Sequence, residues 1–237
     1  MILNNFQKRF LSAVQLNQTQ SSWPVAFTKA NPTSSGKSQH ITYYNSENRY
    51  TFVLADYVID HSFNLDFDSD GVFLRFGLVT KGTSRFKLKQ QERQVFFPSP
   101  YLCYEHGIEG RQHWEKGHHY EAVEVFIEPA FLESLAGISL EEIELLQQLS
   151  ENHVYLSLPQ GVLNSFMDLM RRAKEHRLTP LYLESQMVNC LSLIIDDIKS
   201  GLYIQPNRTK ENAVVPCERV PFRSEEHTSE LQSRHNL

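Results

Sequence analysis

The sequence predicts an α+β fold in which an antiparallel β-sandwich or β-barrel is followed by helices. Between residues 50 and 127, short runs rich in Phe, Tyr, Val and Thr alternate with turn residues at about ten-residue spacing. After Pro129 the apolar residues recur at helical spacing instead. The 237 residues, 41% hydrophobic and 22% charged, are enough to bury the core of one or two domains.

The first 48 residues are mostly polar and irregular. A short amphipathic helix is predicted over residues 5–15, and residues 31–36 read Asn-Pro-Thr-Ser-Ser-Gly, which is turn chemistry. We therefore expect residues 1–48 to form a polar N-terminal lead-in that contributes no core.

The β-rich part predicts seven or eight antiparallel strands. Phe86 and Leu88 alternate with basic residues, and Val123, Val125 and Ile127 alternate with Ala122, Glu124 and Phe126, so each of these strands should place one face on a core. Turns are expected at residues 68–71, 81–82, 98–100, 109–110 and 116–117. The predicted strands cover residues 50–57, 58–67, 72–80, 84–89, 94–97, 101–104, 111–114 and 118–127.

Four helices are expected after the strands. A short one covers residues 130–135, and a second begins at Ser139, with Glu142 at the capping-box position. A third follows Pro159 and ends near Thr179, because the residue before a proline avoids the α region. The fourth covers about residues 181–200 and ends at Gly201.

A barrel followed by an antiparallel helix pair resembles the N-terminal half of AraC/XylS-family transcription regulators. The resemblance rests on residues 73–86 (FLRFGLVTKGTSRF), residues 110–127 (GRQHWEKGHHYEAVEVFI) and residues 181–202, and it covers about residues 49–205. It implies a cupin-like effector-sensing β-barrel over residues 49–128 and a helical dimerisation segment over residues 129–203. It also implies that residues 204–222 begin a linker to a DNA-binding half with two helix-turn-helix motifs, which this sequence lacks.

The C-terminal residues 223–237 are interpreted as a tail that is not natural protein. The first eleven residues of RSEEHTSELQSRHNL match the in-frame translation of a widely used sequencing-library adapter. We therefore exclude the tail from the fold and expect the natural protein to continue beyond Phe222.

Charge and cysteine content bound the compartment and the partners. The longest apolar runs are far short of a membrane span, and the N-terminus lacks the apolar core of a secretory signal. Three widely spaced cysteines, Cys103, Cys190 and Cys217, fit free thiols in a reducing cytoplasm. A net charge of −5 is unfavourable for holding a polyanion, so the chain should contact DNA only through the missing half.

The mouth of an aromatic-lined barrel is a common place for a small ligand. Four residues on predicted strands are candidates for effector binding: Arg75, Tyr104, His113 and Trp114. If Arg75 points inward, it needs an acidic partner or an anionic ligand. The resemblance implies a small-molecule effector, with a sugar as the family-level expectation.

Catalytic and metal-binding patterns are missing from the sequence. His118 and His119 are adjacent, so on a strand they point to opposite faces and do not form the His-x-His spacing of a metal-binding cupin. Asp66, Asp68 and Asp70 lack the Glu that a calcium loop requires, since Gly77 stands at that position. We expect no enzyme activity, metal or cofactor. A stand-alone metal-dependent cupin enzyme and a non-catalytic small-molecule-binding module remain the alternatives.

The last helix carries a wide apolar stripe that predicts a homodimer. Four of its residues follow intervals of four, three and four, and Leu183 widens the stripe. The predicted dimer-interface residues are Leu183, Met187, Leu191, Ile194 and Ile198.

Overall fold

A computed structural model describes residues 5–29, 39–46, 49–88, 91–96, 99–135, 137–147, 149, 154–201 and 203. At residues 5, 6, 67–71, 83–88, 91–96 and 106–108, only the backbone is described. All these residues belong to one unit, residues 1–204. The expected linker over residues 204–222 and the tail over residues 223–237 lie outside the described residues.

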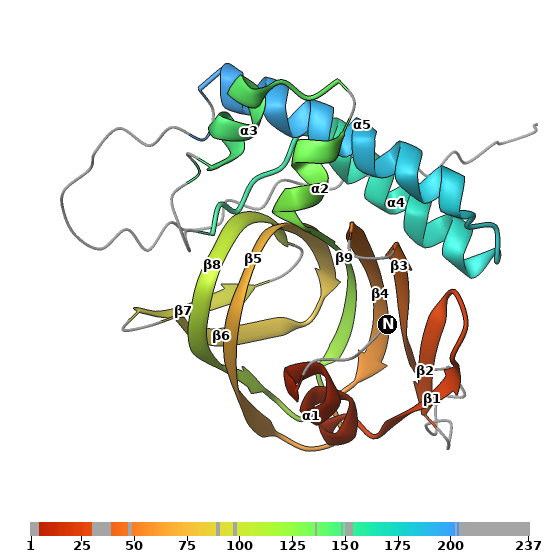
Figure 1. The fold of residues 1–237 in the computed structure, drawn as a ribbon. Helices are drawn as coiled ribbons and strands as arrows, with labels where there is room; N and C mark the ends of the chain where they lie inside the picture. Colours follow the sequence, from red (N-terminus) through yellow and green to blue (C-terminus); the bar gives the residue numbers. More distant parts are fainter. Residues whose placement is uncertain are drawn as a thin grey trace, which may run out of the picture. The chain divides into compact units, whose positions relative to one another are not determined.

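Nine antiparallel strands form one sheet in the order β1-β2-β3-β4-β9-β5-β8-β6-β7. The sheet curls strongly (Figure 1), but no pairing joins β1 to β7 among the described residues. The predicted α+β class with an antiparallel sheet is confirmed. The strands are β1 Leu16–Gln20, β2 Val25–Lys29, β3 His40–Ser46, β4 Tyr50–Val58, β5 Phe63–Lys81, β6 Thr83–Leu88, β7 Gln91–Phe96, β8 Ser99–Trp114 and β9 His119–Ile127.

The N-terminal residues are part of the core, so the expected polar lead-in over residues 1–48 is wrong. The predicted amphipathic helix is present as α1, Asn5–Ala13, and three strands follow it. Phe10, Phe27 and Ile41 are buried. The average composition of residues 1–48 is polar, and this obscured the strands. A strand with a single buried face alternates apolar residues with polar ones, so its average composition is not apolar.

Two long strands replace four predicted short ones. β5 and β8 pair from Phe63 opposite Trp114 to Val79 opposite Ser99, with a register shift between Ser69 and Val72. The turn residues at 68–71 therefore lie at a bulge within a continuous strand, and Glu109-Gly110 lies inside β8. Bulges favour the same small and polar residue types as turns, so the sequence pattern did not separate the two.

All four predicted helices are present: α2 Pro129–Ser134, α3 Leu140–Gln147, α4 Gln160–Lys174 and α5 Pro180–Lys199. The third ends at Lys174 and not near Thr179 as predicted, because His176 adopts a positive φ of 55° that ends the helix before the proline is reached. The capping box before α3 is formed in both directions. The Glu142 backbone N–H donates to Ser139 Oγ at 3.2 Å, and the Ser139 N–H donates to Glu142 Oε2 at 2.8 Å. Pro180 begins α5, with Thr179 Oγ1 accepting a hydrogen bond from the Tyr182 N–H at 3.2 Å.

Helices α2–α5 cover the outer face of the curled sheet, whereas α1 lies against the inner face (Figure 1). On the outer face, Phe76 of β5 stacks on Phe166 of α4 with 5.9 Å between ring centroids. Leu74, Val123 and Val125 are fully buried beside them. The alternate residues of the same strands point to the inner face, where Phe10 of α1 packs on Trp114 and Tyr57.

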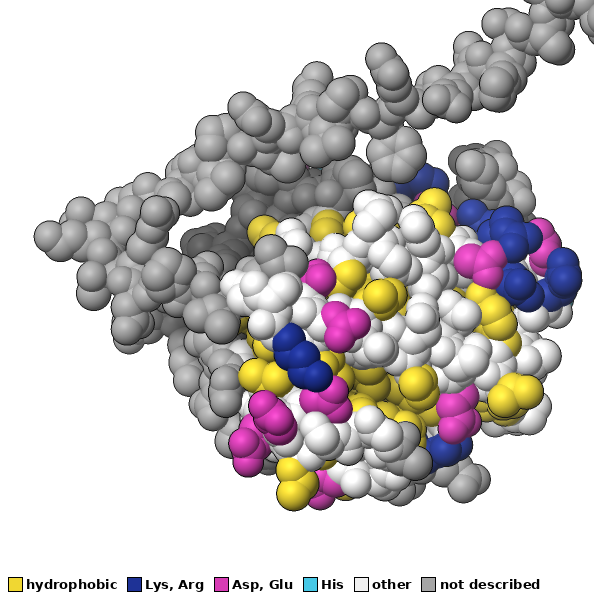
Figure 2. Space-filling model, turned by 90° about the horizontal axis from the view of Figure 1, so that it is seen from above, with side chains coloured by type: hydrophobic (Ala, Val, Ile, Leu, Met, Phe, Trp, Pro, Cys, Tyr) yellow, Lys and Arg dark blue, Asp and Glu magenta, His cyan; other side chains and the backbone are white. Residues whose placement is uncertain are grey.

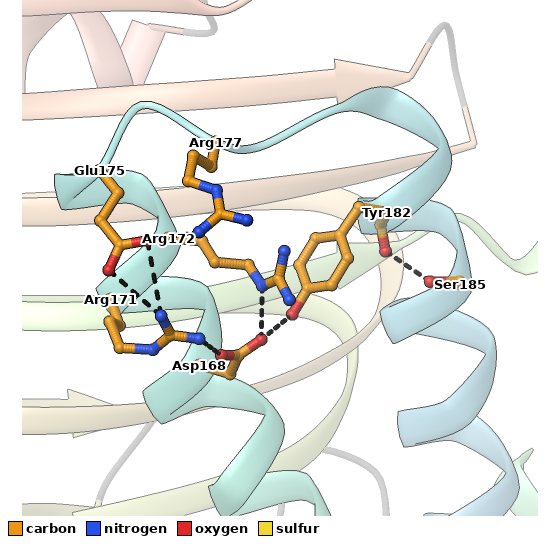
Figure 3. Close-up of polar contacts among 7 residues, drawn as sticks. All are labelled: Asp168, Arg171, Arg172, Glu175, Arg177, Tyr182 and Ser185. Carbon is orange, nitrogen blue, oxygen red and sulfur yellow. Dashed lines mark hydrogen bonds and ion pairs between the residues drawn. The ribbon is translucent and has the colours of Figure 1, made fainter.

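A polar network ties the helix hairpin together at its turn (Figure 3). Asp168 of α4 accepts a hydrogen bond from Arg172 Nε at 2.7 Å, and Arg171 and the Tyr182 hydroxyl also donate to it. The Arg172 guanidinium lies 4.4 Å from the centre of the Tyr182 ring. The network fixes the start of α5 to the end of α4.

The residues predicted for a dimer interface are buried inside their own chain. Leu183, Met187, Leu191, Ile194 and Ile198 all belong to the core that α3, α4 and α5 share with the outer face of the sheet. The apolar stripe of α5 packs against its own domain, so these five residues do not form an exposed face for a second copy. The apolar side chains that remain exposed on the hairpin are Met167, Leu181 and Val188.

Figure 2 shows the helix-covered side from above. Hydrophobic side chains are scattered among polar ones, and Lys and Arg side chains gather at one end. None of the described helices is long and apolar enough to cross a membrane.

Candidate functional site

A polar group lies on the inner face of the sheet where β5, β8 and β9 run side by side. Arg75 of β5 is opposite Cys103 of β8 and Phe126 of β9. Glu105 lies two positions from Cys103 on β8, and Glu124 lies two positions from Phe126 on β9. Both glutamates therefore point to the same face as Arg75, because side chains alternate along a strand. We call Arg75, Tyr101, Glu105, Tyr120 and Glu124 the inner-face cluster.

Arg75 is the centre of the cluster. Its Nη1 lies 3.0 Å from Glu105 Oε1 and its Nη2 3.2 Å from Glu124 Oε1, while Nε donates to the Tyr101 hydroxyl at 3.1 Å. The guanidinium also lies 4.7 Å from the centre of the Phe126 ring and 5.4 Å from that of Tyr101. The charge of Arg75 is therefore matched by the protein itself.

The two carboxylates use one oxygen each for these contacts. Glu124 Oε1 also accepts from the Tyr101 hydroxyl at 2.8 Å and the Tyr120 hydroxyl at 3.4 Å, and the Cys103 thiol lies 3.8 Å from Glu105 Oε1. Within the described part of the chain, Oε2 of Glu105 and Oε2 of Glu124 have no hydrogen-bond partner. Each carboxylate keeps an open acceptor.

The cluster is reached by solvent although it lies inside the curl of the sheet. The Arg75 side chain is 31% exposed, and those of Glu105 and Glu124 are 12% and 14% exposed. Charged groups in such a place are costly unless they are paired, and a guest can approach them from the exposed side.

The surroundings set the ionisation of the cluster. Burial opposes the charge of Arg75, but Tyr101, Glu124 and Glu105 outweigh this effect and raise the pKa of Arg75 well above its ordinary value. Burial is also the main cause that raises the pKa of Tyr101 and Tyr120 well above 10. At neutral pH these phenols are neutral donors and the guanidinium is charged.

Gly77 determines where the Tyr101 ring lies. A Cβ atom at this position would come within 2.8 Å of Tyr101 Cε1 and within 2.8 Å of the Val123 carbonyl oxygen. The ring that forms one wall around Arg75 therefore occupies the space that a side chain at position 77 would need.

The four residues predicted from the sequence do not form one site. Arg75 points inward and has acidic partners, so it does not require an anionic ligand. Tyr104 lies on the outer face, in the core beneath the helices, and so does not line the inner face. His113 makes a separate contact at 2.8 Å from its Nδ1 to Asn64 Oδ1.

Trp114 lies on the inner face beside Tyr120, a member of the inner-face cluster. It is 5% exposed and packs with Phe10 and Tyr120, with 5.1 Å and 5.4 Å between ring centroids. Its indole N–H has no hydrogen-bond partner in the described structure. A buried donor without an acceptor is uncommon and calls for an explanation.

Sequence reasoning missed Tyr101, Glu105, Tyr120 and Glu124. β9 alternates correctly, but its second face was read as solvent-facing, whereas Tyr120 and Ala122 are buried there. A carboxylate flanked at two-residue spacing by Ala122 and Phe126 was the available signal, since a solvated face rarely carries both.

The described histidines do not gather around a common point. His119 Nε2 lies 2.7 Å from Asp56 Oδ1, and His118 Nε2 lies 3.8 Å from Glu115. Among the residues that the structure describes, no three His, Cys, Asp or Glu side chains are placed to hold a metal ion. The His106 side chain is outside the described part.

Comparison with protein families identifies the class of protein. Residues 48–208 match the family described as "Regulatory protein PchR N-terminal domain". The chain therefore belongs to this family of N-terminal regulatory domains from AraC-type transcription regulators, and the resemblance inferred from the sequence is confirmed. No curated protein sequence matches the chain.

The chain also matches solved structures at low sequence identity. The AraC-like transcriptional activator CuxR is 10% identical, with a TM-score of 0.49, and the match covers 87% of this chain and 68% of CuxR. KdgF from Halomonas sp. is 9% identical, with a TM-score of 0.30, over 38% of this chain and 79% of KdgF. A cupin superfamily protein from Desulfitobacterium hafniense is 11% identical, with a TM-score of 0.29, over 48% of this chain and 97% of that protein.

Proposed function

We propose that the inner-face cluster is the place where this regulatory domain binds its small-molecule effector. The observation that carries the proposal is a charged, hydrogen-bonded group that stays partly exposed on the inner face of an otherwise apolar sheet. Natural cores rarely keep such groups without a use, and binding sites combine apolar walls with a few placed polar groups.

The effector signal would pass to the helices through β5 and β9. Both strands carry the cluster on one face and the helix contacts on the other: Phe76 follows Arg75 by one residue and stacks on Phe166 of α4. Glu121 of β9 pairs with Lys174 at the end of α4, with 3.2 Å between Oε1 and Nζ. An effector that contacts two arrangements of these strands unequally would shift the helices between them. In the whole regulator, a DNA-binding half outside this chain would respond.

The domain is proposed to act by binding and not by catalysis, without a metal or cofactor, in the cytoplasm where its DNA target is. Two observations support this over a metal-dependent cupin enzyme. The family is a regulatory one, and the described side chains that contact Arg75 are those of Glu, Tyr and Phe, with no histidine imidazole among them.

A thermal-shift screen of small molecules against the whole chain tests the effector site. A compound that binds the folded state raises the melting temperature by mass action. We expect stabilising compounds to lose their effect in Glu124→Gln and keep it in Glu133→Gln, an exposed carboxylate on α2 that serves as the matched control. If every stabilising compound acts equally on both variants, the inner-face cluster is not the binding site.

Homodimerisation stays part of the proposed function, but through a different surface from the one predicted. The exposed apolar residues of the hairpin, Met167, Leu181 and Val188, are the ones that a second copy would contact. Sedimentation of the chain at several concentrations tests this. A dimer weakened by Val188→Glu and Leu181→Glu supports the surface, and a monomer at every concentration contradicts it.

A further inference from the structure

The inner-face cluster carries an unbalanced charge. Arg75 is one cation shared by two carboxylates, and neither Glu105 nor Glu124 has a second cationic partner in the described part of the chain. An extra negative charge in a poorly solvated place costs free energy that a positively charged guest would offset.

The two carboxylates of the cluster offer open acceptors. Oε2 of Glu105 and Oε2 of Glu124 have no described partner, whereas Arg75 already donates three of its five N–H groups to the protein. A guest that binds to the two carboxylates must therefore bring hydrogen-bond donors.

A second observation, at a separate residue, concerns a donor. The indole N–H of the buried Trp114 has no described partner, and its ring lies 5.4 Å from that of Tyr120, whose hydroxyl bonds to Glu124. An unsatisfied buried donor destabilises the folded protein, so an acceptor on a guest would relieve that cost.

The aromatic walls of the cluster already hold a cation. The Arg75 guanidinium lies over Phe126 and Tyr101, at 4.7 Å and 5.4 Å from the ring centres. The same rings can accommodate a guest ammonium at their remaining surface, because the face of an aromatic ring attracts positive charge.

We propose that the effector is a small organic cation, with an ammonium or amidinium group bound between Glu105 and Glu124 and a hydrogen-bond acceptor directed to Trp114. This proposal rests on the proposed effector site and specifies its ligand class. It differs from the sugar expected from family resemblance, because a sugar would leave the excess carboxylate charge uncompensated.

Four probes with one ring scaffold test the ligand class. Tyramine has an ammonium and a phenol oxygen, phenethylamine lacks the oxygen, 4-ethylphenol lacks the charge and 3-(4-hydroxyphenyl)propionate reverses it. Each is titrated into the whole ¹⁵N-labelled chain to about 10 mM, ten times a Kd of about 1 mM, and the shifted amides are mapped. We expect tyramine to bind about tenfold or more tighter than the propionate, because a charge-assisted hydrogen bond is gained. Phenethylamine should bind more weakly than tyramine.

Isosteric variants assign the two contacts. Glu105→Gln and Glu124→Gln should each weaken tyramine about tenfold and leave 4-ethylphenol unchanged. Trp114→Phe should remove the advantage of tyramine over phenethylamine, while Glu133→Gln serves as the matched control. Circular dichroism verifies the fold of each variant, and either glutamate variant alone suffices if the other is unfolded.

The outcomes separate the ligand class from the site. If the propionate binds as tightly as tyramine and shifts amides of β5, β8 and β9, the cationic class is wrong and the effector site stands. If tyramine shifts only amides of the helices, both are wrong. If no probe binds at the highest concentration, the cationic class is overturned.

Discussion

The two faces of β5 and β9 use the same backbone for opposite purposes. On the outer face, Leu74, Phe76, Val123 and Val125 are fully buried beneath the helices and contain no polar atom. On the inner face, the alternate residues Arg75 and Glu124 form an ion pair that solvent still reaches. The outer face therefore stabilises the domain by burial of apolar side chains. The ion pair of the inner face adds little net stability, although the loss of one partner alone would be costly.

The largest expected effect comes from the outer face. Phe166→Ala removes a fully buried ring stacked on Phe76 and leaves a cavity between α4 and the sheet. The free energy of unfolding should fall by about 3–5 kcal/mol, measured by chemical denaturation. The matched change Leu156→Ala, at a residue that is 55% exposed, should alter it by less than about 0.5 kcal/mol. Equal losses in the two variants would contradict the packing described.

Replacing Arg75, the cation of the inner face, should lower the free energy of unfolding by less than Phe166→Ala does, and it should reveal energetic coupling with Glu105. Arg75→Met leaves Glu105 and Glu124 without their shared partner, so stability should fall by about 2–4 kcal/mol. In the Glu105→Gln background the same change should cost less, because only one carboxylate is then left uncompensated. A double-mutant cycle in urea measures the difference, and strict additivity would show that Glu105 and Arg75 do not interact.

The polar network around Asp168 in the helix hairpin should make the stability of the domain depend on pH in the acidic range. Hydrogen bonds from Tyr182, Arg172 and Arg171 lower the pKa of Asp168 below its usual value. This stabilisation is present above the pKa of an unfolded Asp, about 3.9, and is lost as the pH falls through the lower folded value. Asp168→Asn should therefore lower the free energy of unfolding by about 1 kcal/mol at pH 7 and by progressively less below about pH 4. Chemical denaturation at a series of pH values measures this difference. A difference that stays constant down to pH 2 would argue against the network.

The smallest effect is expected at the start of α3. Ser139→Ala removes the oxygen that accepts the Glu142 N–H and should cost about 1 kcal/mol. Lys199 and the Ser139 backbone lower the pKa of Glu142 to about 2, so stability should also fall between about pH 4.5 and 2. Lys199→Met should weaken that acid dependence while the loss from Ser139→Ala persists. Thermal unfolding measures both.

Local signals predicted the helices well and the strands less well. Ser139, Glu142 and Pro180 act through neighbours along the chain, so the helix starts could be located from residue type alone. The bulge in β5 and the strands at residues 16–46 depend on partners far away in sequence, and residue type does not specify those. In addition, an alternation pattern that identifies one buried face of a strand does not show whether the opposite face is buried as well.

The candidate site was only partly predictable for the same reason. Arg75 was identified because it is a charged residue on a predicted strand, where an inward side chain would need an acidic partner or an anionic ligand. Its partners Glu105 and Glu124 lie on two other strands, so their identity follows from register and not from spacing in the sequence. The apolar stripe of α5 was recognised, but whether it faces its own sheet or a second copy depends on that sheet.

Gly77 gives the site an unusual sensitivity to mutation. It pairs with Glu124 across β5 and β9, and any side chain there would press on both the Tyr101 ring and the Val123 backbone. In a scan of all substitutions read out by folding, Arg75 and Glu124 should tolerate replacements that preserve charge or hydrogen bonding, whereas position 77 should tolerate none. Position 77 requires the absence of a side chain, so no other residue type can replace glycine there.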